Sequence, residues 1–496
     1  MDLRITNRLL DRHARRVFSF AVGVGTLGVL AAAVSCTTTS TIAVMTDEAD
    51  DGSVDAEVHD DAIADAGADA DADADAGDDV DPTMSDAGPP PVQCVDAACA
   101  KSLVLTYGAF PSGGLPPPYP TRQTPGGSYG LCALLDDATV ACWGVGGGGQ
   151  LGRSSPLLSS AVPERVAGLK DIVRLSHTCA VDKDGVTWCW GTGPFLRSSR
   201  AFSAEQTAVE VAIPRATSVD FLYTGDPRIN PNSLVDIHSI GCAVVQDNQV
   251  ACWGMNRNGQ VHPPLLDENG TAGNPVTTIE IPDGAPLQGI FVGTASFLLR
   301  TDGTLLSWGA NPPLGRISSM FPDPRPKPIA LTGISNVDVE AGNVCVVAHG
   351  AVYCWGTTYN GNTAFGDPVA PPMENAMPRR IKLPEPAVSV ATSPGPYGHG
   401  ATNPQRGCAV GLSGDVYCWG SNTSGQAGDG TREFAFVPVK VKGLPAPASS
   451  VRAAALATCA LLTTGKVYCW GENGYGELGN GTLMEPSLAP VEVLLP

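Results

Sequence analysis

The chain has 496 residues, of which 58 are Gly and 42 are Pro, and its formal net charge is −20. Gly and Pro together make up about a fifth of the sequence, which disfavours a mostly helical protein. The acidic balance argues against nucleic acid as a partner, because phosphates are bound by Lys and Arg. A length near 500 residues suggests two or three domains, unless a repeat architecture absorbs it as one.

The N-terminus has the pattern of an export signal. Five Arg residues fall within positions 1–16, and an apolar stretch follows over 17–34. A basic region followed by an apolar run of this length indicates a signal peptide rather than a first domain. Residues 33–36, AVSC, resemble a bacterial lipobox, in which the Cys is diacylated before cleavage. We therefore predict a lipoprotein signal peptide over 1–35 and a lipid anchor on Cys36.

Three alternatives remain open for this region. An ordinary signal peptide and a retained membrane anchor both begin with a basic region and an apolar run. Arg15-Arg16 also gives the twin-arginine pattern, a route that carries folded proteins. A protein that needs many disulfides is better suited to export in the unfolded state and oxidation outside, so we favour the general route.

An acidic low-complexity segment follows. Between Asp47 and Asp86 there are 17 acidic residues, and the stretch 37–100 contains neither Lys nor Arg. Alternating Asp and Ala buries no apolar surface, and the like charges repel each other. We predict a disordered linker that begins at the lipidated Cys and covers 36–93. A calcium loop is the competing interpretation, but Ala76 stands where an EF-hand loop needs Gly.

The fifteen cysteines indicate an internal repeat. Apart from Cys36 they form seven close pairs, and the second Cys of six pairs is followed by Trp-Gly. We predict a disulfide within each pair, namely Cys94 with Cys99, Cys132 with Cys142, Cys179 with Cys189, Cys242 with Cys252, Cys345 with Cys354, Cys408 with Cys418, and Cys459 with Cys469. A further unit ends in Trp308-Gly309 and has Phe297 and Ser307 at the cysteine positions. The seven Trp residues of these units lie 47 to 64 residues apart, an interval typical of repeat proteins.

The spacing within each pair predicts a β-hairpin. In residues 459–469, CALLTTGKVYC, two apolar runs flank a three-residue loop that ends on Gly465 in a left-handed conformation. That loop places the two cysteines opposite each other, close enough to form a disulfide. In 345–354 the cysteines are one residue closer, which predicts a two-residue turn at His349-Gly350 that keeps the pairing. Metal binding is disfavoured, because the sites lack CxxC motifs and clustered His residues.

Each unit also has strands upstream of its hairpin, such as FVPVKVKGL and SVRAAALA before Cys459. Four short strands per unit make one blade of a propeller. The predicted fold is all-β, a seven-bladed β-propeller of four-stranded blades over 94–496. The chain ends in PVEVLLP, and its first blade begins with SLVLTY at 102–107. We therefore predict that one C-terminal strand joins three N-terminal strands to close the ring.

The unit CALLTTGKVYCWGENGYGELGNGT resembles the regulator of chromosome condensation repeat. The shared features are the Cys-Trp-Gly end and the Asn-x-x-Gly-Gln/Glu-x-Gly loop that follows, and the likeness covers roughly residues 100–496. The loop motif changes to GTGPFLRSS in the second unit and GANPPLGRIS in the fourth, so these loops should differ in shape. The resemblance implies a seven-bladed propeller.

The sequence contains no phosphate loop, HExxH motif or nucleophile elbow. His177 near Cys179 suggests a Cys–His nucleophile, but the repeated disulfide uses that cysteine. Functional residues of a propeller lie on its loops and differ among blades. Three insertions, at 111–127, 226–237 and 396–405, are expected between second and third strands and therefore on one rim. The candidate partner-binding residues in or beside them are Tyr119, Arg122, Arg228, Tyr397, His399 and Arg406.

We predict a monomeric binding protein without catalysis, cofactor or metal, held by its lipid in the cell envelope of a bacterium, at the outer membrane or cell surface. Its expected partner is a protein or a cell-surface polysaccharide. One alternative is a lyase or glycosidase, which needs convergent carboxylates or a His on one face. A guanine-nucleotide exchange factor, as in the eukaryotic nuclear member of the family, is a further alternative that an exported protein does not fit.

Overall fold

The computed structural model describes residues 88–94, 98–107, 130–154, 159–197, 202–224, 238–261, 274–311, 313–358, 373–393 and 406–496. The chain divides into two compact units at Ala76 and Gly77, and all described residues belong to the second unit. The predicted signal peptide, Cys36 and most of the predicted linker lie outside the described residues. Within the described residues, no helix has the length and apolar character needed to cross a membrane.

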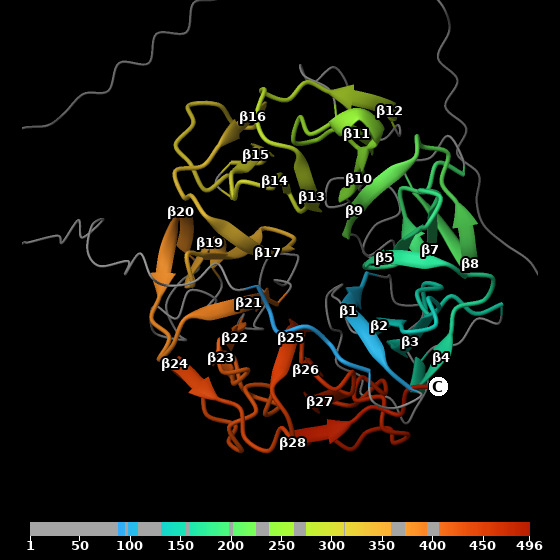
Figure 1. Cartoon of the computed structure of the whole chain (residues 1–496), viewed down its shortest axis with the longest axis vertical. Coiled ribbons are helices and arrows are strands. Elements are labelled where there is room, and N and C mark those ends of the chain that lie inside the picture. Colours follow the sequence, from blue (N-terminus) through green and yellow to red (C-terminus); the bar gives the residue numbers. More distant parts are fainter. Residues whose placement is uncertain are drawn as a thin grey trace, which may run out of the picture. The chain divides into compact units, whose positions relative to one another are not determined.

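The second unit is a ring of seven antiparallel sheets, each made of four consecutive strands (Figure 1). The first blade is β1 (Ala100–Thr106), β2 (Gly130–Leu135), β3 (Val140–Val145) and β4 (Ser159–Arg165), and the second is β5 (Ile172–Ser176), β6 (Cys179–Asp182), β7 (Thr187–Gly193) and β8 (Ser203–Glu210). The third is β9 (Ala216–Thr224), β10 (His238–Val245), β11 (Gln249–Gly254) and β12 (Asn274–Ile279), and the fourth is β13 (Leu287–Val292), β14 (Ala295–Arg300), β15 (Leu305–Gly309) and β16 (Asp323–Pro328). The fifth is β17 (Ile334–Glu340), β18 (Asn343–Ala348), β19 (Ala351–Thr358) and β20 (Met373–Ile381), and the sixth is β21 (Ala387–Thr392), β22 (Arg406–Gly411), β23 (Val416–Gly420) and β24 (Ala435–Lys440). The seventh is β25 (Ala448–Ala453), β26 (Ala457–Leu462), β27 (Val467–Gly471) and β28 (Ser487–Glu492).

Burial follows the order of the strands within a blade. The first strand of each blade lies nearest the centre of the ring, and the fourth lies outermost (Figure 1). In the first blade every residue of β2 and β3 is buried, because neighbouring blades cover both faces of the sheet. The outermost strand β4 has one buried residue. The core therefore consists of the surfaces between blades.

The closure of the ring differs from the predicted one. The C-terminal strand β28 pairs with β27, and the first blade is complete with β1 to β4. The segment FVPVKVKGL, interpreted as a first strand before Cys459, overlaps β24, which is the outermost strand of the preceding blade. The sequence pattern could not set this boundary, because any four consecutive strands of a continuous repeat give the same count.

The repeated Trp residues join neighbouring blades. All seven are less than 2% exposed. The indole Nε1 of Trp190 donates a 2.9 Å hydrogen bond to the carbonyl oxygen of Gln150, in the loop of the preceding blade. Trp308 and Trp470 make the equivalent bonds at 3.0 Å. These residues therefore pack neighbouring blades together.

All seven predicted disulfides are present in the structure. Six of them join directly opposed residues of a hairpin, with Cα atoms 4.0 to 4.2 Å apart. These six are Cys132 with Cys142, Cys179 with Cys189, Cys242 with Cys252, Cys345 with Cys354, Cys408 with Cys418, and Cys459 with Cys469. The seventh bridge, Cys94 with Cys99, precedes the first blade and has Cα atoms 5.6 Å apart.

The hairpins themselves also follow the prediction. Phe297 faces Ser307 in the blade without a bridge, so that blade keeps the register of the others. The two-residue turn is confirmed, because Ala348 pairs with Ala351 around His349 and Gly350. The register of the hairpin is therefore the same in the six blades with a disulfide and in the blade where Phe297 faces Ser307.

Candidate functional site

The direction of the strands places the connections of the propeller on two rims. Consecutive strands within a blade are antiparallel, so first-to-second and third-to-fourth connections lie at one rim, which we term the loop rim. Second-to-third connections lie at the opposite rim, which we term the turn rim. These connections have four residues or fewer between their strands, and the connections from a fourth strand to the next blade, which lie at the same rim, have seven or fewer. The rims therefore differ in how much chain they carry.

The three insertions singled out in the sequence lie outside the described residues, and the strand ends that flank them are at the loop rim. They connect β1 to β2, β9 to β10 and β21 to β22. They therefore join first and second strands, and the expected position between second and third strands was wrong. Of the predicted partner-binding residues, those outside the described part are Tyr119, Arg122, Arg228, Tyr397 and His399.

Arg406 is described, and it does not lie on an exposed loop. It is the first residue of β22 and is 1% exposed. Its guanidinium donates hydrogen bonds to carbonyl oxygens of the seventh blade, those of Ala454, Ala455 and Ala457. Burial lowers the pKa of Arg406 to about 9. The side chain thus joins two blades and is not available to a partner.

Two exposed hydrophobic side chains stand on the loop rim, in the connection between β15 and β16. Ile317 is 88% exposed and Phe321 is 76% exposed. The loop is held in place by buried Arg316, which donates to the Asp323 carboxylate at 2.9 Å and to the Ser307 hydroxyl at 3.1 Å. A fixed loop with exposed apolar side chains suits protein recognition. In the sequence, this loop differed from most of the others only in that the fourth unit departs from the repeated loop motif.

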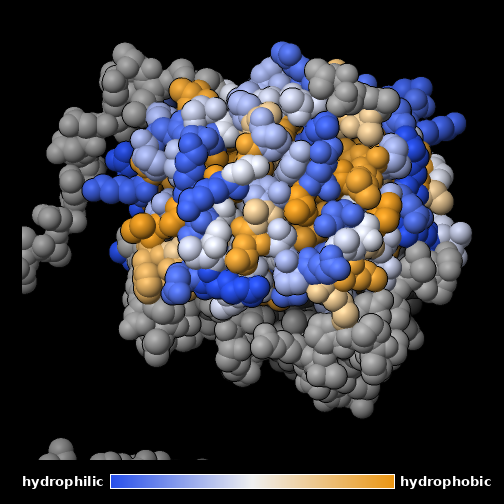
Figure 2. Space-filling model, turned by 90° about the horizontal axis from the view of Figure 1, so that it is seen from below, coloured by the Kyte–Doolittle hydropathy of each residue, from blue (hydrophilic) through white to orange (hydrophobic). Residues whose placement is uncertain are grey.

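Figure 2 shows small groups of apolar side chains on one side of the propeller, among its described residues. Hydrophilic residues separate these groups (Figure 2). Scattered hydrophobic side chains are usual on a protein surface and call for no partner.

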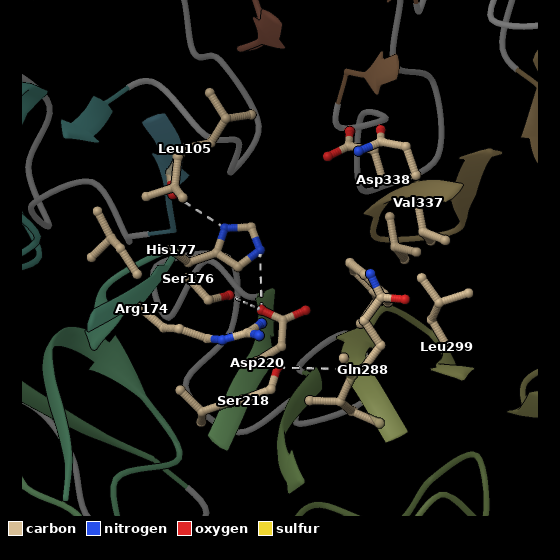
Figure 3. Close-up of a pocket in the computed structure, with 18 of the residues that line it drawn as sticks. Leu105, Arg174, Ser176, His177, Ser218, Asp220, Gln288, Leu299, Val337 and Asp338 are labelled. Atoms are coloured by element: carbon tan, nitrogen blue, oxygen red, sulfur yellow. Dashed lines mark hydrogen bonds and ion pairs between the residues drawn. The ribbon is translucent and has the colours of Figure 1, made fainter. Parts of the chain in front are cut away.

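A cavity of about 270 Å³ lies at the centre of the ring. Its walls come from the first strands β1, β5, β9, β13, β17 and β25 (Figure 3). On the first strands, the side chain opposite the first hairpin cysteine, or opposite Phe297 in the fourth blade, varies among the blades, and only Asp occurs twice. These residues are Val104, Ser176, Asp220, Phe291, Asp338, Ala391 and Arg452. Variation at one structural position is the pattern expected of functional residues in a repeat protein.

Each carboxylate oxygen of Asp220 accepts a hydrogen bond. Ser176 Oγ donates to its Oδ1 at 2.6 Å, and the backbone N–H of Val292 donates to its Oδ2 at 2.7 Å. Burial raises the pKa of Asp220 to about 7. Ser176 is bonded to the carboxyl group rather than to an imidazole, so the arrangement is not a nucleophilic triad.

His177 lies beside Asp220, with its Nε2 atom 3.4 Å from Asp220 Oδ1 (Figure 3). Its Nδ1 is 3.1 Å from the carbonyl oxygen of Leu105. A carbonyl only accepts, so Nδ1 carries the proton and Nε2 presents a lone pair to Asp220. Burial lowers the pKa of His177 to about 3, which keeps the ring neutral. Cys179 is in its disulfide, so the structure contains no Cys–His nucleophile at this position.

Two further carboxyl groups line the cavity from β17. The Tyr107 hydroxyl donates to Glu340 Oε2 at 2.9 Å. The backbone N–H of Thr392 donates to Asp338 Oδ2 at 2.8 Å, and Asp338 Oδ1 lies 3.9 Å from the Arg452 guanidinium. Burial raises the pKa of both carboxyls, and repulsion by Asp338 adds to the effect on Glu340. The structure thus gathers carboxyl groups that the sequence could not bring together.

Sequence comparison finds the regulator of chromosome condensation (RCC1) repeat over residues 413–461 and again over 456–477. The chain contains RCC1 repeats. The ultraviolet-B receptor UVR8 of Arabidopsis thaliana is 25% identical over 396 residues, which cover 77% of this chain and 71% of that protein. The E3 ubiquitin-protein ligase HERC2 of Homo sapiens is 31% identical over 145 residues, which cover 28% of this chain and 3% of the ligase.

Solved structures show the same fold. Prp20p from Saccharomyces cerevisiae, described with its binding properties to Gsp1p and histones, has a TM-score of 0.54 and 18% identity. The match covers 71% of this chain and 85% of that one. Human WBSCR16 also has a TM-score of 0.54 and 18% identity, over 72% of this chain and 93% of that one. At this identity the likeness establishes an RCC1-like propeller fold and nothing further.

Proposed function

We propose that this chain is a protein-binding propeller tethered to a bacterial envelope membrane, with its loop rim directed away from the anchor. The observation that carries the proposal is that the N-terminal segment and the long connections lie at opposite rims. A binding face opposite the point of attachment stays accessible when the other rim is turned toward the membrane.

The N-terminal segment of the propeller packs on the turn rim. The backbone N–H of Gln93 donates to the carbonyl oxygen of Thr463 at 2.7 Å, within the turn between β26 and β27. Ser449 Oγ donates to the carbonyl oxygen of Pro90 at 2.6 Å. The backbone N–H of Ala100 donates to the carbonyl oxygen of Gly465 at 2.9 Å. The chain therefore enters the propeller along the turn rim of the seventh blade.

The tether in this proposal is the lipid on Cys36 and the acidic segment that follows it. A flexible coil of the length of residues 37–93 spans about 40 Å, and repulsion among its carboxylates extends it further. The spacer leads to the turn rim, so the tethered propeller presents its loop rim to its surroundings. Diacyl chains supply two anchoring signals, enough for stable attachment.

A protein is the favoured partner. Ile317 and Phe321 expose apolar surface on a loop held by buried polar contacts, which suits a protein interface better than a polysaccharide. Protein binding is also the property described for Prp20p. The name of the HERC2 ligase lends little support to catalysis, because the match leaves nearly all of that protein uncovered.

Site-specific photocrosslinking tests the proposal. p-Benzoylphenylalanine replaces Phe321 on the loop rim or, as a matched control, Leu412 in a turn-rim connection, where Leu412 is 47% exposed. Irradiation of intact cells should yield one protein adduct from position 321 and none from 412. Intact mass of the purified mature chain should show acylated Cys36 at its N-terminus. Adducts from 412 alone, or a mature chain without acyl groups, would contradict the proposal.

A further inference from the structure

The axial cavity has a feature that protein recognition at the loop rim leaves unused. Its charged lining is unbalanced: three carboxyl groups, those of Asp220, Asp338 and Glu340, share it with two guanidinium groups. Arg452 lies 3.9 Å from Asp338, and His177 is neutral. Burial raises the pKa of each of the three carboxyls, and the charge of Arg452 only partly opposes this at Asp338 and Glu340.

Glu340 points to a missing ligand. The residue is 2% exposed and lines the cavity. Its Oε2 accepts the hydrogen bond from Tyr107, and no described residue donates to its Oε1. Buried polar atoms nearly always have a partner, so an open carboxylate oxygen on a cavity wall marks a position for a donor that is not part of the chain.

The exposure of the lining residues decreases along the cavity, from its open end, the mouth, to its closed end. Gln288 and Ser335 are exposed and lie near the start of their first strands, which is the turn-rim end, and exposed Arg174 lies at the middle of β5. Glu340 and His177 are buried, and each lies at the opposite end. A ligand therefore enters from the turn rim and meets the carboxyl groups last. Figure 3 shows Arg174, Gln288 and Asp338 directed toward the same space.

The chemistry of the walls distinguishes among cations. The described residues contain no group of three or more His, Cys, Asp or Glu side chains placed to hold a metal ion. The mouth offers neutral donors and acceptors, those of Gln288, Ser335 and Asn336, which match hydroxyl groups. A volume of about 270 Å³ is near the lower end of small-molecule sites.

We propose that the axial cavity binds a small hydroxylated primary amine, with its ammonium group between Glu340 and Asp338 and its hydroxyl groups at the mouth. The ammonium donates to the open Oε1 of Glu340 and offsets the repulsion among the three carboxyls. Arg174 and the amides at the mouth bind the hydroxyl groups. The site is separate from the loop rim and does not depend on the tether.

Isothermal titration of the full chain with glucosamine and glucose tests this site, because the two sugars differ at the amino group. Glucosamine should bind and glucose should bind at least about tenfold more weakly. Glu340→Gln should lose glucosamine binding by at least about tenfold, while its melting temperature stays equal or rises, because glutamine keeps the acceptor for Tyr107 and does not ionise. Glu433→Gln, at an exposed carboxylate of the loop rim, should bind like the wild type.

Asp338→Asn provides a second test at the same site and should also weaken glucosamine binding. Equal binding of both sugars would overturn the proposal, because the ammonium would then be irrelevant. Unchanged glucosamine binding by Glu340→Gln and Asp338→Asn would overturn it as well, and so would no binding of glucosamine at 10-millimolar order. Photocrosslinking at Phe321 is unaffected by any of these results, so the failure of one proposal is distinguishable from the failure of the other.

Discussion

The indole Nε1 of Trp143 donates a hydrogen bond of 2.9 Å to the carbonyl oxygen of Glu477, which lies 334 residues further along the chain. Trp143 belongs to the first blade and Glu477 to the loop between β27 and β28 of the seventh. Leu103 and Leu461 pack in the same buried cluster across this interface. The ring is therefore closed without a shared strand, by the same kind of bond that Trp190, Trp253, Trp308, Trp355 and Trp470 make to their preceding blades.

Trp143→Phe should lower the melting temperature more than Trp308→Phe. Each change removes one buried indole hydrogen bond, worth about 1 kcal/mol. The third and fourth blades, joined by Trp308, remain linked through the chain, whereas the first and seventh blades are held by contacts alone. Hydrogen exchange of β25 to β28 should rise in Trp143→Phe and stay unchanged in Trp308→Phe. Equal melting temperatures for the two variants would contradict this account of the closure.

Glu477→Gln should stabilise the propeller at alkaline pH. Gln150 and Gln426 hold the equivalent loop position and accept a backbone N–H bond as Glu477 does, at 2.6, 2.7 and 2.8 Å respectively. Burial raises the pKa of Glu477 to about 8, and the charge of Glu472 adds to the effect. Glutamine keeps the acceptor and removes the buried charge.

The sign of the pH dependence follows from the raised pKa. Between pH 4.5 and about 8 the folded chain keeps a proton on Glu477 that the unfolded chain loses, so stability falls as the pH rises. The difference between Glu477→Gln and the wild type should therefore grow across this window, to on the order of 2 kcal/mol at pH 9. Urea unfolding at several pH values measures it. A difference independent of pH would show that the carboxyl is not protonated in the folded state.

The sequence predicted the blades far better than the site. Cysteine and Trp spacing determines the hairpin, because opposed disulfide partners and a left-handed loop residue constrain the register locally. The blade boundary depends on whether a strand between two hairpins pairs with the hairpin before it or with the one after it. The spacing of Cys and Trp within a hairpin does not indicate which. Asp220 and Asp338 were overlooked for the same reason, since their equivalence appears only when each first strand is paired with its own hairpin.

Arg406→Met should destabilise the fold without touching a partner surface. The buried guanidinium bonds to carbonyl oxygens of the seventh blade, and the substitution leaves those oxygens unpaired at a cost of roughly 2–4 kcal/mol. Arg432→Met, at an exposed residue of the loop rim, is the matched control and should change the free energy of unfolding by about 0.5 kcal/mol or less. Thermal unfolding of both variants gives the comparison. A stable Arg406→Met with reduced partner binding would restore the interpretation of this residue as part of a binding surface.

Ala138→Gly should stabilise the first blade, and Gly414→Ala should destabilise the sixth. Both residues end a three-residue hairpin loop with positive φ, 60° for Ala138 and 83° for Gly414. A left-handed conformation strains an L-residue with a Cβ atom, so Gly at 138 should add about 0.5–1 kcal/mol to the free energy of unfolding, after its greater freedom in the unfolded chain is counted. The reverse change adds that strain at 414 and also brings a Cβ atom 2.3 Å from Cβ of Pro447, so its loss should be larger than the gain at 138. Denaturant unfolding of the two single variants measures both effects, and a destabilised Ala138→Gly would show that the first hairpin does not hold its loop residue in the left-handed region.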